Sequence, residues 1–170
     1  IQGNVIIVGQ STGFPATDTL GFGNVILVNP YPSSRMLYVF KFSSGGTVLW
    51  GRQIYTQNGL GYDCYMGEVG VDSTGNVYVC GTFNAPYLYF SNTGSILQNT
   101  NLIQYRSDIF ICKYGPMGNV IWMRKEGSAE HDEASNIAVS PGGNFYISGG
   151  FLSLSISFVG SPLVNVDPTG

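Results

Sequence analysis

The chain repeats itself. The segment GNVIIVG at residues 3–9 returns as GNVYVCG at residues 75–81 and as GNFYISG at residues 143–149. A second unit, residues 38–52, matches residues 110–124 with its Lys, Gly, Trp and Arg in register. Such self-similarity indicates copies of one supersecondary unit that pack side by side, because none of them buries its apolar face alone. The repetition therefore predicts an assembly of similar sheets and disfavours a compact enzyme.

Composition favours short strands joined by tight turns. Only 10% of the residues are charged, against about 25% in an ordinary soluble domain. The chain contains 24 glycines and 14% aromatic residues, which suit turns and pleated surfaces. The net charge of −3 without a basic cluster argues against nucleic acid as a partner. No apolar run reaches the roughly 20 residues of a membrane-spanning helix, so we expect no membrane insertion.

One period predicts four strands in two hairpins. The first hairpin joins residues 68–72 to residues 76–81, and the second joins residues 108–114 to residues 119–125. Each pair consists of two alternating runs around a turn that contains Gly or Pro. No segment shows helical periodicity with caps. We therefore expect an all-β fold.

Alternation assigns side chains to faces of these strands. It puts Phe110 on the same face as Tyr114, with Cys112 between them, and it puts Val120 on the same face as Trp122 and Arg124. Both faces of each strand are largely apolar. Strands of this kind are covered on both sides, so we expect neighbouring sheets to pack face to face.

A variable segment, residues 82–107, separates the two hairpins and predicts an additional short hairpin. Its aromatic residues Tyr87, Tyr89 and Phe90 have two interpretations. If they are exposed, they form an apolar patch that suits a protein partner. Otherwise they pack on the next unit. The sequence leaves both interpretations open.

These patterns resemble the SBBP family of β-propeller repeats. The resemblance rests on DIFICKY at residues 108–114, GNVIW at residues 118–122, and GGNFYISG at residues 142–149, with DEA at residues 132–134 between the last two. The segment STGFP at residues 11–15 is similar to the Phe-Pro-containing linker of that family. The chain departs from the pattern at Ser140, which stands where Asp72 stands in the other copy. The resemblance implies propeller blades and a structural or surface-associated role.

A propeller blade has four antiparallel strands, and four to eight blades close a ring. On this reading residues 1–54 form the later strands of one blade, residues 67–125 form a complete blade with its insertion, and residues 135–170 form the first strands of a third. Such an incomplete ring implies other blades of the same parent chain, or other protein subunits, as partners.

Trp50 with Arg52, and Trp122 with Arg124, recur two residues apart and so share a strand face. Equivalent positions in two copies favour packing between blades, because a recognition site seldom recurs unchanged. The alternatives are stacking of Arg on Trp, or Trp as an aromatic platform for carbohydrate.

Candidate catalytic and metal-binding residues are few. His131, the single histidine, lies among carboxylates but has no second ligand motif, so we expect a solvated loop. Asp72 is expected to bind the backbone of its own turn rather than calcium. Cys64, Cys80 and Cys112 suit small buried positions, and whether Cys80 pairs with Cys112 stays open. We therefore predict no catalytic residue, cofactor or metal.

The function that these observations favour is a non-catalytic structural or interaction module that presents loops to protein partners. An extracellular or cell-surface location is favoured, with a virus particle or another large assembly as the alternative. The second hypothesis is a carbohydrate-binding propeller. The third, an enzyme that uses carboxylates of the propeller channel, is the least favoured.

Overall fold

The computed structural model describes residues 3–11, 19–31, 34–57, 62–91, 94–99, 106–158 and 161–166. Within these ranges all regular structure is β, and no helix is present that is long and apolar enough to cross a membrane. The strands are, in chain order, β1 (Val5–Ser11), β2 (Thr19–Phe22), β3 (Val25–Val28), β4 (Met36–Phe42), β5 (Val48–Thr56), β6 (Cys64–Val71), β7 (Val77–Phe83), β8 (Tyr87–Phe90), β9 (Ser95–Gln98), β10 (Asp108–Tyr114), β11 (Val120–Glu126), β12 (Asp132–Val139), β13 (Phe145–Phe151), β14 (Ser155–Phe158) and β15 (Ser161–Val164).

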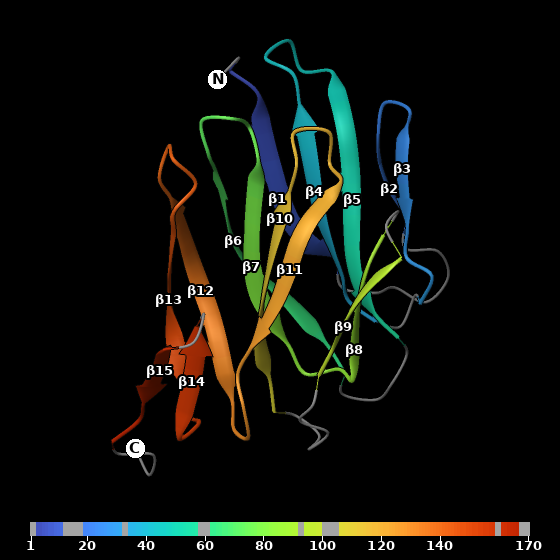
Figure 1. The fold of residues 1–170 in the computed structure, drawn as a ribbon. Helices are drawn as coiled ribbons and strands as arrows, with labels where there is room; N and C mark the ends of the chain where they lie inside the picture. The colour runs from blue at the N-terminus through green and yellow to red at the C-terminus, as the bar shows by residue number, and fades with distance from the viewer. Residues whose placement is uncertain are drawn as a thin grey trace.

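Three open sheets fan out side by side (Figure 1). The first sheet has the order β1-β4-β5-β8-β9, the middle sheet has the order β11-β10-β7-β6, and the third sheet consists of β12 and β13. All of the strand pairs are antiparallel. The hairpins β2–β3 and β14–β15 form two further small sheets. The expectation of an all-β fold is therefore confirmed, and within the described residues none of the sheets closes on itself.

Apolar side chains fill the spaces between the sheets. One cluster joins the first sheet to the middle sheet and includes Leu37, Val39, Val79 and Phe110, each fully buried. A second cluster joins the middle sheet to the third sheet and to β14; it contains Ile111 and, from β12, Ile137. Strands with two apolar faces therefore lie between neighbours, as alternation predicted.

A β-bulge changes one of the predicted faces. Lys113 of β10 pairs with Trp122, but Tyr114 pairs with Val120, so Ile121 is the extra residue. The bulge turns Val120 toward the cluster between the first and middle sheets, whereas Trp122 packs against the cluster on the other side. The prediction that Val120 shares a face with Trp122 is therefore wrong, because a bulge shifts the alternation by one residue.

The predicted hairpin within residues 82–107 is present as β8 and β9, but it extends the first sheet rather than the middle one. Tyr89 of β8 pairs with Tyr55 of β5, and β5 is the outer strand of the preceding unit. The backbone N–H of Gln53 donates to the Ser91 hydroxyl at 2.9 Å, which fixes the end of β8 on β5. Each inserted hairpin follows the strand that begins directly after a repeated Gly-Asn pair. The hairpins β2–β3 and β14–β15 therefore stand at places equivalent to that of β8–β9.

Candidate functional site

Strand β5 of the first sheet holds the β10–β11 turn of the middle sheet through side-chain donors. The indole N–H of Trp50 donates to the Pro116 carbonyl at 2.9 Å, and the Arg52 Nε donates to the Gly118 carbonyl at 2.7 Å. Lys41 of β4 reaches the same turn, since its ammonium donates to the Pro116 carbonyl at 3.2 Å. Trp50 is only 5% exposed. Because the ring is buried between sheets, Trp50 is not available as a carbohydrate platform.

Burial also affects the charges at this contact. It lowers the pKa of Arg52 from its ordinary value, and the nearby Tyr114 partly offsets that shift. Burial likewise lowers the pKa of Lys41. The guanidinium of Arg52 lies 5.6 Å from the centre of the Trp50 ring, so the two side chains also make a cation–π contact.

Trp122 and Arg124 occupy the equivalent positions on the middle sheet but meet different neighbours. The Trp122 ring packs against Tyr78 and Phe145, with ring centres 6.1 and 5.7 Å away. Arg124 is exposed and lies 5.7 Å from the centre of the Trp122 ring. Among the described residues, the indole N–H of Trp122 donates to no acceptor. The sheet-to-sheet packing role of this pair stays a prediction.

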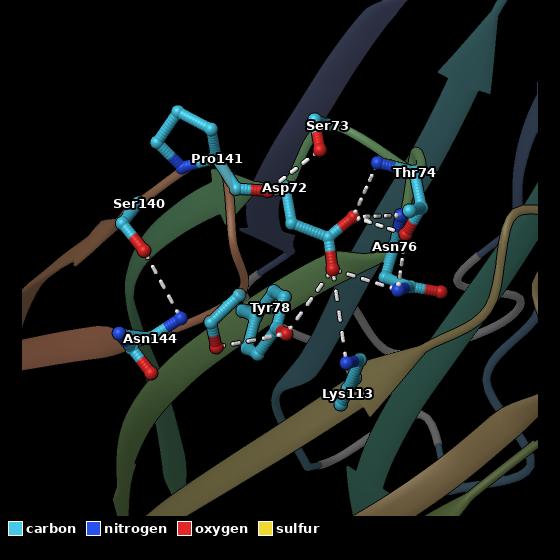
Figure 2. A network of polar contacts seen from close by, with 10 residues as sticks. Asp72, Ser73, Thr74, Asn76, Tyr78, Lys113, Ser140, Pro141 and Asn144 are labelled. Atoms are coloured by element: carbon cyan, nitrogen blue, oxygen red, sulfur yellow. Dashed lines mark hydrogen bonds and ion pairs between the residues drawn. The ribbon is translucent and has the colours of Figure 1, made fainter.

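Asp72 is the centre of a polar network at the end of β6 (Figure 2). The backbone N–H groups of Thr74 and Asn76 both donate to its Oδ1 at 3.0 Å, which confirms the predicted turn. Its Oδ2 accepts from the Tyr78 hydroxyl at 3.2 Å and lies 3.7 Å from the Lys113 ammonium. Burial alone would raise the pKa of Asp72, but hydrogen bonds from Asn76 and Thr74 outweigh it and hold the pKa well below its usual range.

The same network joins the middle sheet to the third. The Tyr78 hydroxyl lies 3.2 Å from the Gly143 carbonyl, and the Ser73 hydroxyl donates to the Pro141 carbonyl at 2.7 Å (Figure 2). In the third sheet Ser140 stands in the place of Asp72, and its hydroxyl accepts from the Asn144 N–H at 3.1 Å. A serine therefore closes the local turn but does not reach the neighbouring strands.

Four tyrosines gather where the inserted hairpin joins the first sheet, and we call them the tyrosine surface: Tyr31, Tyr55, Tyr87 and Tyr89. The rings of Tyr55 and Tyr89 stack with their centres 5.5 Å apart and a 10° angle between their planes. Tyr31 lies beside Tyr55 at 6.1 Å, and Tyr87 lies beside Tyr89 at 6.3 Å. Burial is the main cause that raises the pKa of Tyr55 and of Tyr89, and the neighbouring phenols raise it further. The surface is therefore a neutral aromatic one.

The three aromatic residues singled out in the hairpin differ in exposure. Tyr87 is 41% exposed and Tyr89 is partly buried, but Phe90 is only 2% exposed. The Phe90 ring meets Phe110 edge-on at 6.3 Å inside the core. Phe90 is therefore not part of an exposed patch, since the pairing of β8 with β5 turns it inward. Tyr87 and Tyr89 remain candidates for partner contact.

His131 lies in an exposed loop. Its Nδ1 makes a hydrogen bond with the Ser107 hydroxyl, and its Nε2 lies 3.8 Å from Glu133 Oε2. The structure contains no group of three His, Cys, Asp or Glu side chains that could hold a metal ion, as far as its described residues extend. The three cysteines are buried and unpaired, so Cys80 forms no disulfide with Cys112. Burial raises the pKa of the Cys112 thiol to about 12, which leaves it protonated.

Comparison with known proteins identifies a repeat-containing relative. No protein-family model matches the chain. Over 130 residues, 68% of its length, the chain is 30% identical to an uncharacterized WD repeat-containing protein of Acanthamoeba polyphaga mimivirus. The chain spans 9% of the length of that protein. WD repeats are units of four strands that build β-propellers. The similarity points to a propeller-type repeat without singling out the SBBP family.

Sequence reasoning missed several residues of these contacts. Tyr31 and Tyr55 join the tyrosine surface from the first sheet, far from the hairpin in the chain. Lys41 lies at the same repeat position as Lys113, and this recurrence was the available signal for its role. Tyr31 carries no such signal, because its position depends on pairing between β8 and β5.

We expect replacement of Trp50 by Phe to lower the free energy of unfolding by about 1–3 kcal/mol, because the buried indole loses its hydrogen bond to the Pro116 carbonyl and part of its packing between the sheets. Urea unfolding followed by circular dichroism measures the change. Leu49→Ala is the matched control, since Leu49 is the neighbouring residue and is 49% exposed; its expected effect is within about 0.5 kcal/mol. Equal effects of the two substitutions would contradict a specific contact by Trp50.

Proposed function

We propose that the chain is a segment of an SBBP-type β-propeller that acts as a non-catalytic protein-interaction module. Sheets of equivalent strands that pack face to face support this proposal, and so does the WD repeat-containing relative. In this arrangement residues 67–125 supply a complete blade, and residues 1–54 and 135–170 supply parts of its two neighbours. Trp50 and Arg52 pack one blade against the next, and Trp122 and Arg124 have the same role one blade later.

The observation that carries the interaction role is the tyrosine surface. Tyr87 lies on β8, which is fixed by its pairing with β5, so its ring stands on rigid backbone. Tyrosine gives a large contact area with little loss of side-chain entropy, and for this reason it is frequent in protein-binding surfaces. Ile96, which pairs with Tyr89 across the hairpin, is 47% exposed and extends the apolar area. The partner that this surface fits is a protein within an extracellular layer, a cell surface or a particle shell.

Tyr87→Ser is expected to weaken partner binding at least about tenfold, as loss of an interface tyrosine commonly does. The immobilised chain would be exposed to an extract of its source, and each retained protein would be identified and its affinity measured. Ile121→Ser is the matched control, because Ile121 is 49% exposed on the bulge of β11, outside the tyrosine surface. Unchanged binding by the Tyr87 variant, with both variants folded, would contradict the role of this surface.

Carbohydrate is the second candidate ligand. The buried Trp50 no longer supports it, but the partly exposed Tyr55 and Tyr89 rings keep an aromatic face at the surface. A glycan array separates the two functions. Saturable binding of one sugar class that disappears in Tyr87→Ser would favour carbohydrate over a protein partner.

A further inference from the structure

The third sheet has an open edge where the middle sheet has two more strands. In the middle sheet β7 pairs with β10, which pairs with β11. The equivalent strand of the third sheet, β13, pairs with β12 on one side. Within the described part of the chain no strand pairs with its other side. An unpaired strand edge presents backbone donors and acceptors that are suited to another strand.

A cleft of about 440 Å³ lies beside this edge. Arg124 lines it from β11, Phe145 and Ile147 line it from β13, and Phe158 and Leu163 line it from the hairpin β14–β15. The lining is mostly apolar.

The equivalent space beside β7, one repeat unit earlier in the chain, is filled by β10. There, Phe110 and Tyr114 of β10 are buried together with Trp50 of the first sheet, Val79 of β7 and Phe90 of the inserted hairpin. The elements around that site correspond one by one to those that line the cleft. The earlier site is thus an example, within the same chain, of what the cleft accommodates.

The side chains at the rim of the cleft also correspond to those that surround the β10–β11 turn. Trp50 and Arg52 donate to the carbonyls of Pro116 and Gly118 in the β10–β11 turn. Trp122 and Arg124 stand at the same positions on β11 and face the cleft side of the middle sheet. Neither of these two donors has a carbonyl acceptor among the described residues. Both are therefore available to a turn that lies over them.

We propose that this cleft binds an antiparallel strand pair of the same repeat type as β10–β11. The first strand of the pair hydrogen-bonds to the open edge of β13, and the carbonyls of its turn accept from Trp122 and Arg124. This inference rests on the proposed propeller arrangement and names the partner of one specific surface. That surface is separate from the tyrosine surface.

The existing contact also defines the chemistry of the partner. A Cβ added at Gly118, whose φ is +80°, would lie 2.8 Å from the Trp50 ring and 2.9 Å from the Arg52 guanidinium. The turn that meets Trp122 therefore needs glycine at the corresponding position, for both space and backbone conformation. Its first strand needs apolar side chains at alternate positions, as Phe110 and Tyr114 provide in β10.

The test adds a strand pair of this type to the whole chain. A copy of residues 105–126, joined after Gly170, keeps the spacing that separates β9 from β10. Trp50→Phe, together with Phe in place of the copied tryptophan, leaves Trp122 as the single tryptophan. We expect its emission to shift to shorter wavelength, its quenching by acrylamide to decrease, and the Tm to rise by about 5 °C or more, a change readily measured for a chain of this size. The control carries the same 22 added residues in scrambled order.

Two further variants examine the donors and the turn. Arg124→Ala should remove part of the Tm gain in the extended chain and leave the Tm of the unextended chain nearly unchanged. Replacing the copied Gly118 by Val should abolish the gain. If the extended chain is insoluble, a synthetic peptide of residues 105–126 added to the unextended Trp50→Phe chain replaces it, and saturable protection of Trp122 is the expected result.

The proposal is overturned if the copied and scrambled extensions give the same Trp122 emission and Tm, or if the peptide has no saturable effect. Protection of Trp122 that grows with the concentration of the unextended chain would assign the cleft to a second copy and would also overturn it. Loss of partner capture in Tyr87→Ser is independent of these readouts. Failure of the cleft assignment and failure of the interaction role are therefore distinguishable.

Discussion

Gly81→Ala is expected to lower the free energy of unfolding by about 3 kcal/mol, at the upper end of the cost of overpacking. A Cβ on Gly81 would lie 2.2 Å from the Tyr65 carbonyl oxygen and 2.6 Å from the Phe110 ring. The carbonyl belongs to β6, which pairs with β7 through a bulge next to this point. Backbone that is held in a sheet cannot move aside as a flexible side chain can. Urea unfolding measures the effect.

The chain supplies two matched controls. Gly9 is the same residue of the repeated segment in the first sheet, but its Cβ would meet the end of the Tyr38 side chain, with the phenol oxygen at 2.4 Å. That ring can rotate, so Gly9→Ala should cost about 1 kcal/mol or less. Gly142→Ala faces open space and should change stability little. Equal costs at Gly81 and Gly9 would contradict the backbone contact as the cause.

The close contact at Gly81 also explains why the repeated segment keeps a glycine at its end. Glycine ends the segment in all three copies, at Gly9, Gly81 and Gly149. In the third copy a Cβ on Gly149 would lie 2.0 Å from the Glu133 carbonyl oxygen of β12, again beside a bulge. The sequence predicts strands that end at these glycines. The reason for glycine lies in the adjacent strand, whose bulge does not follow from local propensity.

The strands of the middle sheet were predictable because each carries its own pattern. The predicted range 108–114 coincides with β10, and the ranges 68–72 and 119–125 differ from β6 and β11 by a few residues. Alternation also placed Phe110, Cys112 and Tyr114 together correctly. These assignments depend on neighbours in sequence, where the period of two residues is a direct signal.

The contacts between units were less predictable. The pairing of β8 with β5 decides that Phe90 is buried and that Tyr55 stacks on Tyr89. Nothing in the alternation of residues 87–90 distinguishes this pairing from a hairpin that projects into solvent. The hairpin β2–β3 was not predicted at all. Its apolar residues Val25 and Leu27 pack against Phe40 of the first sheet, a contact specified by the tertiary fold and not by a repeat.

Asp72→Ala is expected to lower the free energy of unfolding by about 2–4 kcal/mol, because a buried carboxylate with several donors disappears and leaves those donors without an acceptor. Asp72 is 3% exposed and accepts from Thr74 and Asn76 as well as from Tyr78, while Lys113 lies close by. The loss affects both the local turn and the junction with the third sheet. Chemical unfolding at neutral pH gives the magnitude.

Asp72→Ser is the control that the repeat itself provides, since Ser140 closes the equivalent turn with its hydroxyl. We expect this variant to keep the turn and to lose the contacts with Tyr78 and Lys113, so its cost should be about half that of Ala. The pH dependence of the unfolding free energy shows whether the negative charge of Asp72 is responsible for the stabilisation. Because the folded state holds the pKa of Asp72 below its usual range, its stabilisation is complete above the unfolded pKa of about 3.9 and is lost as the pH falls toward the folded value.

The difference in unfolding free energy between the wild type and Asp72→Ser should therefore be constant near neutral pH and should shrink below about pH 4. The other carboxylates are common to both proteins and cancel in this difference. A difference that stays unchanged into the acid range would mean that Asp72 stabilises the junction by its shape and not as an anion. The measured slope thus reports the contribution of one negative charge to the junction between two repeat units.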